Sequence, residues 1–383
     1  MWKDLSGTCC MNSISEIFRE HDANDNVSFL QVFQLLKEQE WYEPDTGTHI
    51  KIIDMLGKCK QASVAFSVFR LMIEEKCIPT VEAYTALLSA YTRSNLLDKA
   101  FIILEEMKKT PYCHPDIYTY SELIRACSEV KDLDRVCMLL SEMQNIGLTP
   151  NTVTYNILID AYGKAGMFED MENLFMEMVK GERCRPDAWT QNAMLRCYAK
   201  ARNIERMEYW YAKILSFGYR PNVITFNTLL DAYGKECMFE RLELVLDFMH
   251  KYCYRGTTVT YNTVINAYGK AGCIEKVRNT YKEMVMQGVK EDARTFCSLI
   301  DAHGKLGFWK KVEKLLRQMR NLNIEPDIAV YNAALDAYRR AGRKVEMHRV
   351  LVEMEDQGIE GDKYTEQILG MALSNREKMH SGI

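Results

Sequence analysis

An amide, a carboxylate and an ammonium group stand together at regular intervals along this 383-residue chain. In one copy they are Asn156, Asp160 and Lys164, which lie four residues apart and therefore form one ridge on the surface of a helix. An amide donates and accepts hydrogen bonds, a carboxylate only accepts them, and an ammonium group attracts anions. Such a ridge suits recognition by hydrogen bonds and charge, and its recurrence indicates a ligand that is itself repetitive.

The position of Lys164 is basic in eight of nine copies, with Glu129 as the exception, although the chain has a formal net charge of -4. Aspartates four residues earlier pair with several of these cations, but such pairs are worth only about 0.2–0.5 kcal/mol. They also leave Arg93, Lys200 and Lys270 without a partner in their own helix. We therefore predict a stripe of cations facing the phosphates of an anionic polymer. This basic stripe consists of Lys58, Arg93, Lys164, Lys200, Lys235, Lys270, Lys305 and Arg340.

Short hydrogen-bonding side chains recur at two further positions, the fifth and the last residue of each copy. Helix capping is enough to explain the last position, because Asp, Asn and Thr accept hydrogen bonds at helix N-termini. It does not explain the fifth position, which lies inside a helix where such residues are mediocre formers. The fifth residues are Ile50, Thr85, Ser121, Asn156, Asn192, Asn227, Asn262, Cys297 and Asn332. The last residues are Thr80, Asp116, Asn151, Asp187, Asn222, Thr257, Asp292, Asp327 and Asp362.

Motifs for catalysis are missing from the sequence. None of the 7 histidines is followed by x-Glu, the 13 cysteines form no CxxC, and no segment has the GxxxxGK[ST] spacing of a phosphate loop. The aspartates of the ridge recur once per copy, which keeps them too far apart to share a metal pair. Cys113 and His114 are adjacent but isolated, so a loop is a better interpretation than a metal site. We predict no enzyme, no metal and no cofactor.

Helices must hold these groups in register, and proline gives the spacing of the repeating units. Seven of the 8 prolines, at positions 44, 79, 115, 150, 186, 221 and 326, follow a period of 35 or 36 residues. Each unit contains two stretches with the i, i+3, i+4, i+7 spacing of an amphipathic helix. Gly166 suits the end of a first helix, where a residue with positive φ is favoured. In that unit the two apolar faces are Tyr155, Leu158, Ile159 and Tyr162, then Met171, Leu174, Phe175 and Met178.

The expected fold is all-α, a solenoid of helix-turn-helix repeats of 35–36 residues. An N-terminal segment or cap at 1–26 and a partial repeat with only a second helix at 27–45 come first. A partial repeat with only a first helix and a polar C-terminal cap follows at 363–383. Between them lie nine repeats at 46–80, 81–116, 117–151, 152–187, 188–222, 223–257, 258–292, 293–327 and 328–362.

The repeat length, the VTYN…LIDAYGKAG first helix at 153–166 and the terminal Pro-Asp or Pro-Asn resemble the pentatricopeptide repeat, in its repeat-only class. The resemblance covers about residues 27–383. A tetratricopeptide repeat would show a period of about 34 residues and a Trp-Leu-Gly-Tyr pattern, which is not found. The resemblance implies a right-handed superhelix that binds single-stranded RNA, one base per repeat.

The family's code pairs the fifth residue of a repeat with its last residue. Asparagine donates and accepts while aspartate only accepts, so such a pair can match a Watson–Crick edge in one orientation. The implied readers are Thr85 with Asp116 for guanine, Ser121 with Asn151 for adenine, Asn192 with Asn222 for cytosine, Asn227 with Thr257 for a pyrimidine, and Asn156 with Asp187, Asn262 with Asp292 and Asn332 with Asp362 for uracil. Ile50 with Thr80 and Cys297 with Asp327 depart from the common pairs. Family members run parallel to RNA, so the implied target is 5′-(N)GAUCYUNU-3′, where Y is a pyrimidine.

The second residue of a repeat sandwiches bases between neighbouring repeats in this family. Three repeats depart from this pattern with Gly47, Glu82 and Arg294, and lack an apolar clamp. The central repeats carry the implied clamps Val153, Trp189, Ile224 and Val259.

No apolar run approaches the roughly 18–20 residues of a membrane span. The first twenty residues contain Asp4, Glu16 and Glu20, unlike an Arg-rich transit peptide. The resemblance implies action in a chloroplast or mitochondrion, with the targeting signal outside this sequence. The implied roles are RNA processing, RNA stabilisation or intron splicing, with RNA-processing or splicing factors as further partners. The chain is then a monomer or an RNA-dependent dimer.

Two other classes of function compete with RNA binding. Helical solenoids also hold peptides, and the acidic net charge favours such a protein-binding scaffold, but a scaffold gives no reason for Asn, Ser and Thr at the fifth position. RNA cleavage by the chain itself is the third class, and it lacks the motifs that the chemistry requires.

Overall fold

The computed structural model describes residues 45–181 and 184–380, with side chains as far as Met371. It divides into two compact halves at Pro186. Every regular element in the described residues is an α-helix. The predicted segments 1–26 and, apart from Asp45, 27–45 lie outside the described residues.

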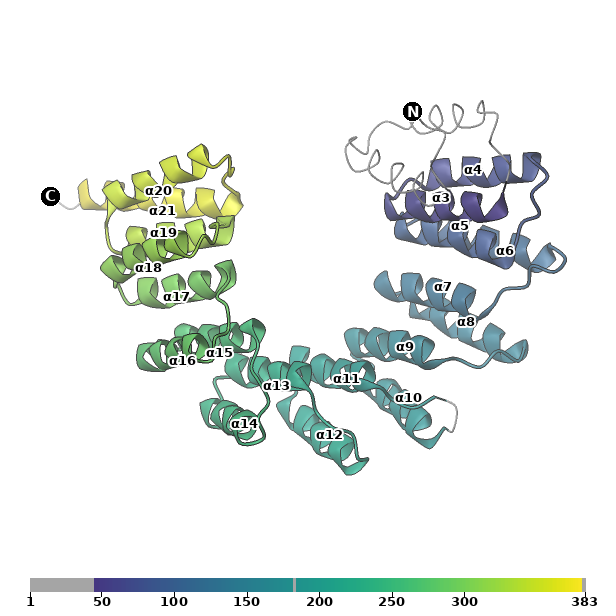
Figure 1. Ribbon diagram of the computed structural model, residues 1–383, viewed down its shortest axis with the longest axis horizontal. Coiled ribbons are helices and arrows are strands. Elements are labelled where there is room, and N and C mark those ends of the chain that lie inside the picture. Colours follow the sequence, from purple (N-terminus) through teal and green to yellow (C-terminus); the bar gives the residue numbers. More distant parts are fainter. Residues whose placement is uncertain (1–44, 182–183, 381–383) are drawn as a thin grey trace, which may run out of the picture. The chain divides into compact units, whose positions relative to one another are not determined.

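The N-terminal half contains helices in sequential pairs (Figure 1), and we call the members of each pair the first and the second helix. Each pair lies within one of the predicted ranges between residues 46 and 187. The helices are α3 (Thr46–Lys58), α4 (Ala62–Glu74), α5 (Val81–Arg93), α6 (Leu97–Lys109), α7 (Ile117–Glu129), α8 (Leu133–Asn145), α9 (Thr152–Ala165) and α10 (Phe168–Lys180).

The C-terminal half continues the same alternation and ends in α21 (Lys363–His380), a first helix whose partner is not among the described residues. Its pairs again lie within the predicted ranges, from 188 to 362. They are α11 (Ala188–Lys200), α12 (Ile204–Ser216), α13 (Val223–Lys235), α14 (Phe239–Lys251), α15 (Thr258–Lys270), α16 (Ile274–Met286), α17 (Ala293–Lys305), α18 (Trp309–Asn321), α19 (Ile328–Arg340) and α20 (Lys344–Asp356).

The apolar spacing in the sequence identified the packed faces of α9 and α10. Tyr155 and Leu174 are half-buried. Gly166 ends α9 with φ 78°, which confirms the left-handed position expected there. The remaining members of the predicted faces are all buried: Leu158, Ile159, Tyr162, Met171, Phe175 and Met178.

First helices stack directly on first helices within each half, and each second helix lies against its own first helix (Figure 1). Small residues permit the close stacking. A β-carbon added at Gly57 would lie 3.0 Å from Ala90 Cβ, and one at Gly304 would lie 2.5 Å from Ala337 Cβ. Gly57 and Gly304 are each the twelfth residue of a repeat, and each meets the tenth residue of the next repeat. The first helices therefore stack in the same register in both halves.

Side chains at the last position of each repeat cap the first helix of the next. Each of them accepts a hydrogen bond from the backbone N–H three residues further on. The capping role expected for this position is therefore confirmed, and such caps are typically worth about 0.5–2 kcal/mol. The caps are Asp45, Thr80, Asp116, Asn151, Asp187, Asn222, Thr257, Asp292, Asp327 and Asp362.

Candidate nucleic-acid interface

The fifth residue of a repeat, its last residue and a threonine of the next repeat form a hydrogen-bonded group, which we call the polar cluster. In repeat 258–292, Asn262 Nδ2 donates to Asp292 Oδ1 at 2.9 Å. Thr295 Oγ1 lies 2.7 Å from Asn262 Oδ1 and 2.8 Å from Asp292 Oδ1. The helix cap and the fifth residue are thereby held side by side.

The same cluster recurs in two other repeats of the C-terminal half. In each, the Asn Nδ2 donates to the last residue and the threonine hydroxyl donates to the Asn Oδ1. The members are Asn192, Asn222 and Thr225, at 3.3 Å and 2.7 Å, and Asn332, Asp362 and Thr365, at 3.1 Å and 2.7 Å. The arrangement is thus a property of the repeat and not of one site.

Other repeats keep the contact between the fifth residue and the threonine. Thr260 Oγ1 donates to Asn227 Oδ1 at 2.7 Å, although Thr257 replaces the usual Asn or Asp cap. In the N-terminal half Thr85 Oγ1 lies 2.9 Å from Thr119 Oγ1. Ser121 Oγ likewise lies 2.7 Å from Thr154 Oγ1. Short hydroxyl side chains therefore fit the same place as asparagine.

Sequence analysis missed the threonine, although a signal was present. It is the third residue of most repeats, where the TVTYN segment carries it. Ala83 and Val330 are the exceptions among the nine repeats. The recurring residues are Thr48, Thr119, Thr154, Thr190, Thr225, Thr260 and Thr295, followed by Thr365 in α21.

The cluster leaves hydrogen-bonding capacity for a ligand. With Oδ1 engaged by Thr295 and Nδ2 by Asp292, Asn262 keeps one N–H and one lone pair. All the hydrogen bonds that described residues donate to Asp292 reach Oδ1, which leaves Oδ2 as an acceptor. Burial favours a raised pKa for Asp292, but hydrogen bonds from Asn262 and Thr295 outweigh it and the pKa is lowered. The carboxylate is therefore ionised at neutral pH and acts only as an acceptor.

Exposed apolar side chains accompany the buried residues of the polar cluster. Asn262 is 5% exposed, whereas Val259, the second residue of the same repeat, is 57% exposed. The guanidinium carbon of Arg196 lies 5.6 Å from the centroid of the Trp189 ring. The predicted clamps Val153, Trp189, Ile224 and Val259 are all exposed.

A cavity of about 250 Å³ in the N-terminal half brings several of these positions together. Thr85 and Ser121, the fifth residues of adjacent repeats, line it with Asn151. Tyr118 and Val153, the second residues of adjacent repeats, line it as well. Tyr118 is 72% exposed and had not been named as a clamp, although its place in the repeat predicts that role.

Two predicted pairs, Cys297 with Asp327 and Ile50 with Thr80, lack the complete cluster among the described residues. Cys297 Sγ lies 3.6 Å from the backbone oxygen of Ala329, and Val330 replaces the threonine. Burial, with the charges of Asp327 and Asp301, raises the pKa of the Cys297 thiol to about 11, so it is neutral at pH 7. Ile50 and Ala83 likewise offer no polar side chain beside Thr80. Of the predicted pair Asn156 and Asp187, Asn156 is buried in α9 of the N-terminal half, and Asp187 caps α11 of the C-terminal half.

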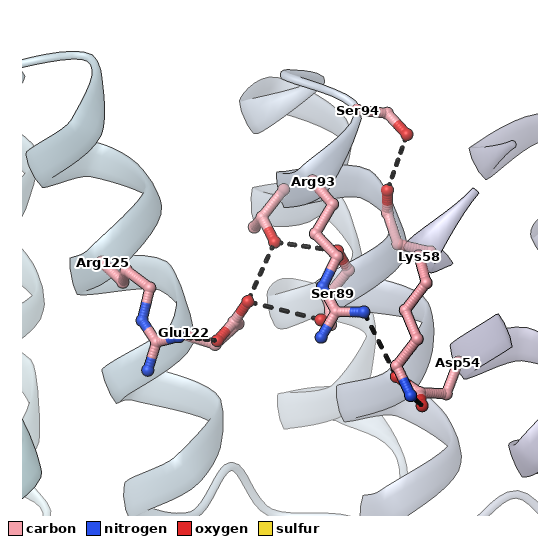
Figure 2. A network of polar contacts seen from close by, with 9 residues as sticks. Asp54, Lys58, Ser89, Arg93, Ser94, Glu122 and Arg125 are labelled. Carbon is pink, nitrogen blue, oxygen red and sulfur yellow. Dashed lines mark hydrogen bonds and ion pairs between the residues drawn. The ribbon is translucent and has the colours of Figure 1, made fainter. Parts of the chain in front are cut away.

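The basic stripe is largely paired with aspartates. Asp54 pairs both with Lys58 at 2.7 Å and with Arg93 of the next repeat at 3.4 Å (Figure 2). Sequence reasoning had considered only partners within a helix and so had left Arg93 unpaired. Lys200 and Lys270 are exposed and pair with no carboxylate among the described residues. The other paired members are Lys164 with Asp160 at 2.5 Å, Lys235 with Asp231 at 2.6 Å, Lys305 with Asp301 at 2.6 Å and Arg340 with Asp336 at 2.7 Å.

The pairs of Lys58, Lys235 and Lys305 have both side chains substantially exposed, and these pairs restrain the cations only weakly. Exposed salt bridges typically contribute about 0–1 kcal/mol, so such a cation can exchange its carboxylate partner for another anion at little cost. Within the described part of the chain, no group of three or more His, Cys, Asp or Glu side chains is placed to hold a metal ion. Nor is any described helix long and apolar enough to cross a membrane.

Stacked helix pairs that repeat at intervals of 35 or 36 residues define a helical-repeat protein. Models of pentatricopeptide repeats match the chain over most of its length, and the chain belongs to the pentatricopeptide repeat family. The PPR repeat family model matches residues 150–200 and 256–305. The pentatricopeptide repeat domain model matches 32–94, 103–165 and 314–364, and the PPR repeat model matches 82–110, 192–219, 224–254 and 294–324.

Known proteins of this family resemble the chain in part. A chloroplastic pentatricopeptide repeat-containing protein of Arabidopsis thaliana is 44% identical over 191 residues, covering 50% of this chain and 38% of that protein. A second pentatricopeptide repeat-containing protein of Arabidopsis thaliana is 41% identical over 208 residues, covering 54% of this chain and 46% of that protein. The chain thus spans less than half the length of these curated relatives. Among solved structures, maize PPR10 in complex with an 18-nt psaJ RNA element is 23% identical with a TM-score of 0.48, covering 96% of this chain and 56% of that chain.

Proposed function

We propose that this chain binds single-stranded RNA sequence-specifically, with one base facing each repeat. The observation that carries the proposal is the polar cluster with its open donor and acceptor, which recurs in repeats 188–222, 258–292 and 328–362. Asn262 and Asp292 represent it, and Val259 stands beside them as an exposed apolar residue. A nucleobase matches this combination, because its face stacks on apolar side chains while its edge forms hydrogen bonds.

The proposed target is 5′-(N)GAUCYUNU-3′, read by the fifth and last residues in the order of the repeats. At the Asn262–Asp292 pair, the carboxylate accepts from uracil N3–H and the amide N–H donates to a uracil oxygen. The basic stripe follows the same first helices and contacts the phosphates. Trp189 and the other exposed second residues, Tyr118 included, separate successive bases.

We place this activity in the chloroplast, where the protein processes or stabilises a transcript or supports intron splicing by occupying its RNA. Names of relatives support the compartment: two of the Arabidopsis thaliana proteins that match the chain at 44% and 39% identity are chloroplastic. Binding alone is sufficient for such roles, since a bound repeat array shields RNA from nucleases and holds it single-stranded.

Fluorescence anisotropy with a labelled RNA, 5′-AGAUCUUAU-3′, tests the function. We expect it to bind at least about a hundredfold tighter than a scrambled RNA of the same composition, because a wrong base typically costs about 1–3 kcal/mol. A duplex of the same sequence serves as the control for general attraction to phosphates. Equal affinity for the matched and scrambled strands would refute sequence-specific reading.

Removing an unpaired cation is expected to weaken RNA binding more than removing a paired one. Lys270→Gln should lower the slope of log affinity against log salt by about 0.7, the value for one phosphate contact to a single strand. Lys235→Gln, at the same position of the preceding repeat, should lower it less, because Asp231 already lies 2.6 Å from Lys235. Salt titrations of both variants check this, and equal slopes would contradict a phosphate role for the unpaired cation.

A further inference from the structure

A basic cavity of about 530 Å³ lies on the second-helix side of the C-terminal half. It is formed by α16, by the end of α17 and by the start of α18, away from the fifth and last residues of the repeats. Arg278 contributes from α16, and Lys310, Lys311 and Lys314 from α18. The volume is in the range of cavities that hold small organic ligands, about 300–1,000 Å³.

Charge at this cavity is of one sign. Four cations line it and no carboxylate does so among the described residues. Arg278 lies 3.4 Å from Glu275, whereas Lys310, Lys311 and Lys314 are exposed and pair with no carboxylate in the described part of the chain. The basic stripe, in contrast, is mostly paired with aspartates. The cavity therefore suits an anionic ligand.

Aromatic side chains accompany the cations. Phe308 is 51% exposed and lines the cavity together with Trp309. The Arg343 guanidinium carbon lies 3.9 Å from the Trp309 ring centroid and holds that ring in place. His303 also lines the cavity and is buried, and its Nδ1 lies 2.8 Å from the Leu299 backbone oxygen. Burial lowers the pKa of His303, and the charges of Lys311 and Arg278 lower it further, so the imidazole is neutral at pH 7.

We propose that this cavity binds a nucleotide of the single-stranded RNA that lies 3′ to the base-read segment. The inference rests on the proposed function. Lys310, Lys311 and Lys314 contact the phosphates, and the base stacks on Phe308. An exposed aromatic ring among unpaired cations favours a nucleotide over an acidic peptide, because a nucleotide supplies both a π-face and a charge.

The position of the cavity fits an RNA that leaves the base-reading surface. Gly307 of the cavity is two residues after Lys305, a member of the basic stripe, so the stripe and the cavity adjoin at the turn between α17 and α18. An RNA bound parallel to the chain brings its 3′ end to the C-terminal repeats. The 3′ flank emerges at repeat 328–362, one repeat beyond the cavity, and reaches this turn by folding back over that repeat without a base-specific contact.

Extended RNAs test the proposal on the full chain. The matched RNA is compared with versions that carry eight extra adenosines at the 3′ end or at the 5′ end. The wild type should bind the 3′-extended RNA about tenfold tighter than the matched RNA, and the 5′ extension should add less. In Lys310→Gln/Lys311→Gln/Lys314→Gln this gain should vanish and the salt slope on the 3′-extended RNA should fall by about 2, from three phosphates.

A charge-matched variant controls for general attraction. Lys251→Gln/Lys282→Gln/Lys290→Gln removes three exposed cations elsewhere in the half and should retain the gain. Affinity for the unextended RNA should stay the same in the cavity variant. A 3′ extension that adds no affinity, or a gain that survives in the cavity variant, overturns the inference and leaves an acidic protein as the partner to test. Failure of the wild type to distinguish matched from scrambled RNA instead refutes the proposed base reading.

Discussion

Asn262→Thr should change the base preferred by repeat 258–292 from uracil to guanine. The chain contains the precedent, because Thr85 occupies the fifth position beside Asp116, and its hydroxyl lies 2.9 Å from Thr119 Oγ1. A threonine at 262 would meet Thr295 in the same way and keep the fold of the cluster. It would lose the amide N–H that we assign to uracil. The matched RNA should bind about 5- to 150-fold more weakly, corresponding to roughly 1–3 kcal/mol for one base contact.

Four RNAs that differ only at the base facing this repeat provide the measurement. Guanine at that position should recover most of the lost affinity in the variant while weakening binding to the wild type. Asn266→Thr is a matched control, because it makes the same substitution in the same helix, at the ninth position and outside the polar cluster. It should leave the base preference unchanged. If Asn262→Thr still prefers uracil, the polar cluster does not face a base.

The helix pairs could be predicted because their signals are local. The spacing of Leu158 and Ile159 on one face of a helix, and the left-handed Gly166 after it, depend on residues within a few positions of each other. The cap at Asp187 acts on Thr190, three residues away. Such contacts have the same geometry in any helix, so a sequence pattern is enough to place them.

Contacts between repeats could not be predicted in the same way. Thr295 looks like an ordinary partner of the cap at Asp292, and its second partner, Asn262, is 33 residues away. Arg93 likewise pairs with Asp54, which lies 39 residues earlier in the chain. These distances depend on how closely and at what rotation the first helices stack, which a period of 35 or 36 residues does not specify. The candidate pairs were therefore predicted, while the threonine that joins them was not.

The basic cavity on the second helices could not be predicted either, because it too is formed by residues of different repeats. A run such as WKKVEKLLRQMRN at 309–321 could be an ordinary solvated helix face. Only the neighbouring α16 and the turn before α18, which bring Arg278 and Phe308 to the lysines, turn that run into a concave surface. Charge along one helix predicts attraction, whereas a cavity needs residues from several helices.

Gly304→Ala is expected to destabilise the C-terminal half by about 1–3 kcal/mol, the usual cost of overpacking. The added β-carbon would lie 2.5 Å from Ala337 Cβ and 3.1 Å from Ala337 Cα. Favourable carbon contacts are near 3.5–4.0 Å, and neither atom of Ala337 can rotate away, so α17 and α19 must separate. Alanine also gains about 0.5–1 kcal/mol in a helix interior. That gain in stability is smaller than the cost of separating two stacked helices, so the net effect of the substitution is destabilising.

Gly370→Ala is the matched control, because Gly370 is an exposed helical glycine, and an added β-carbon would lie within 4 Å of no described residue outside its own stretch of helix. We measure the midpoint of urea-induced unfolding. The midpoint should stay the same or rise in Gly370→Ala, and it should fall in Gly304→Ala. Adding Ala337→Gly to Gly304→Ala removes the clash from the other side. The double variant should then be more stable than the sum of the two single effects predicts. Hydrogen exchange in α17 and α19 locates the change, and strictly additive effects would show that the two residues do not meet as the stacked helices require.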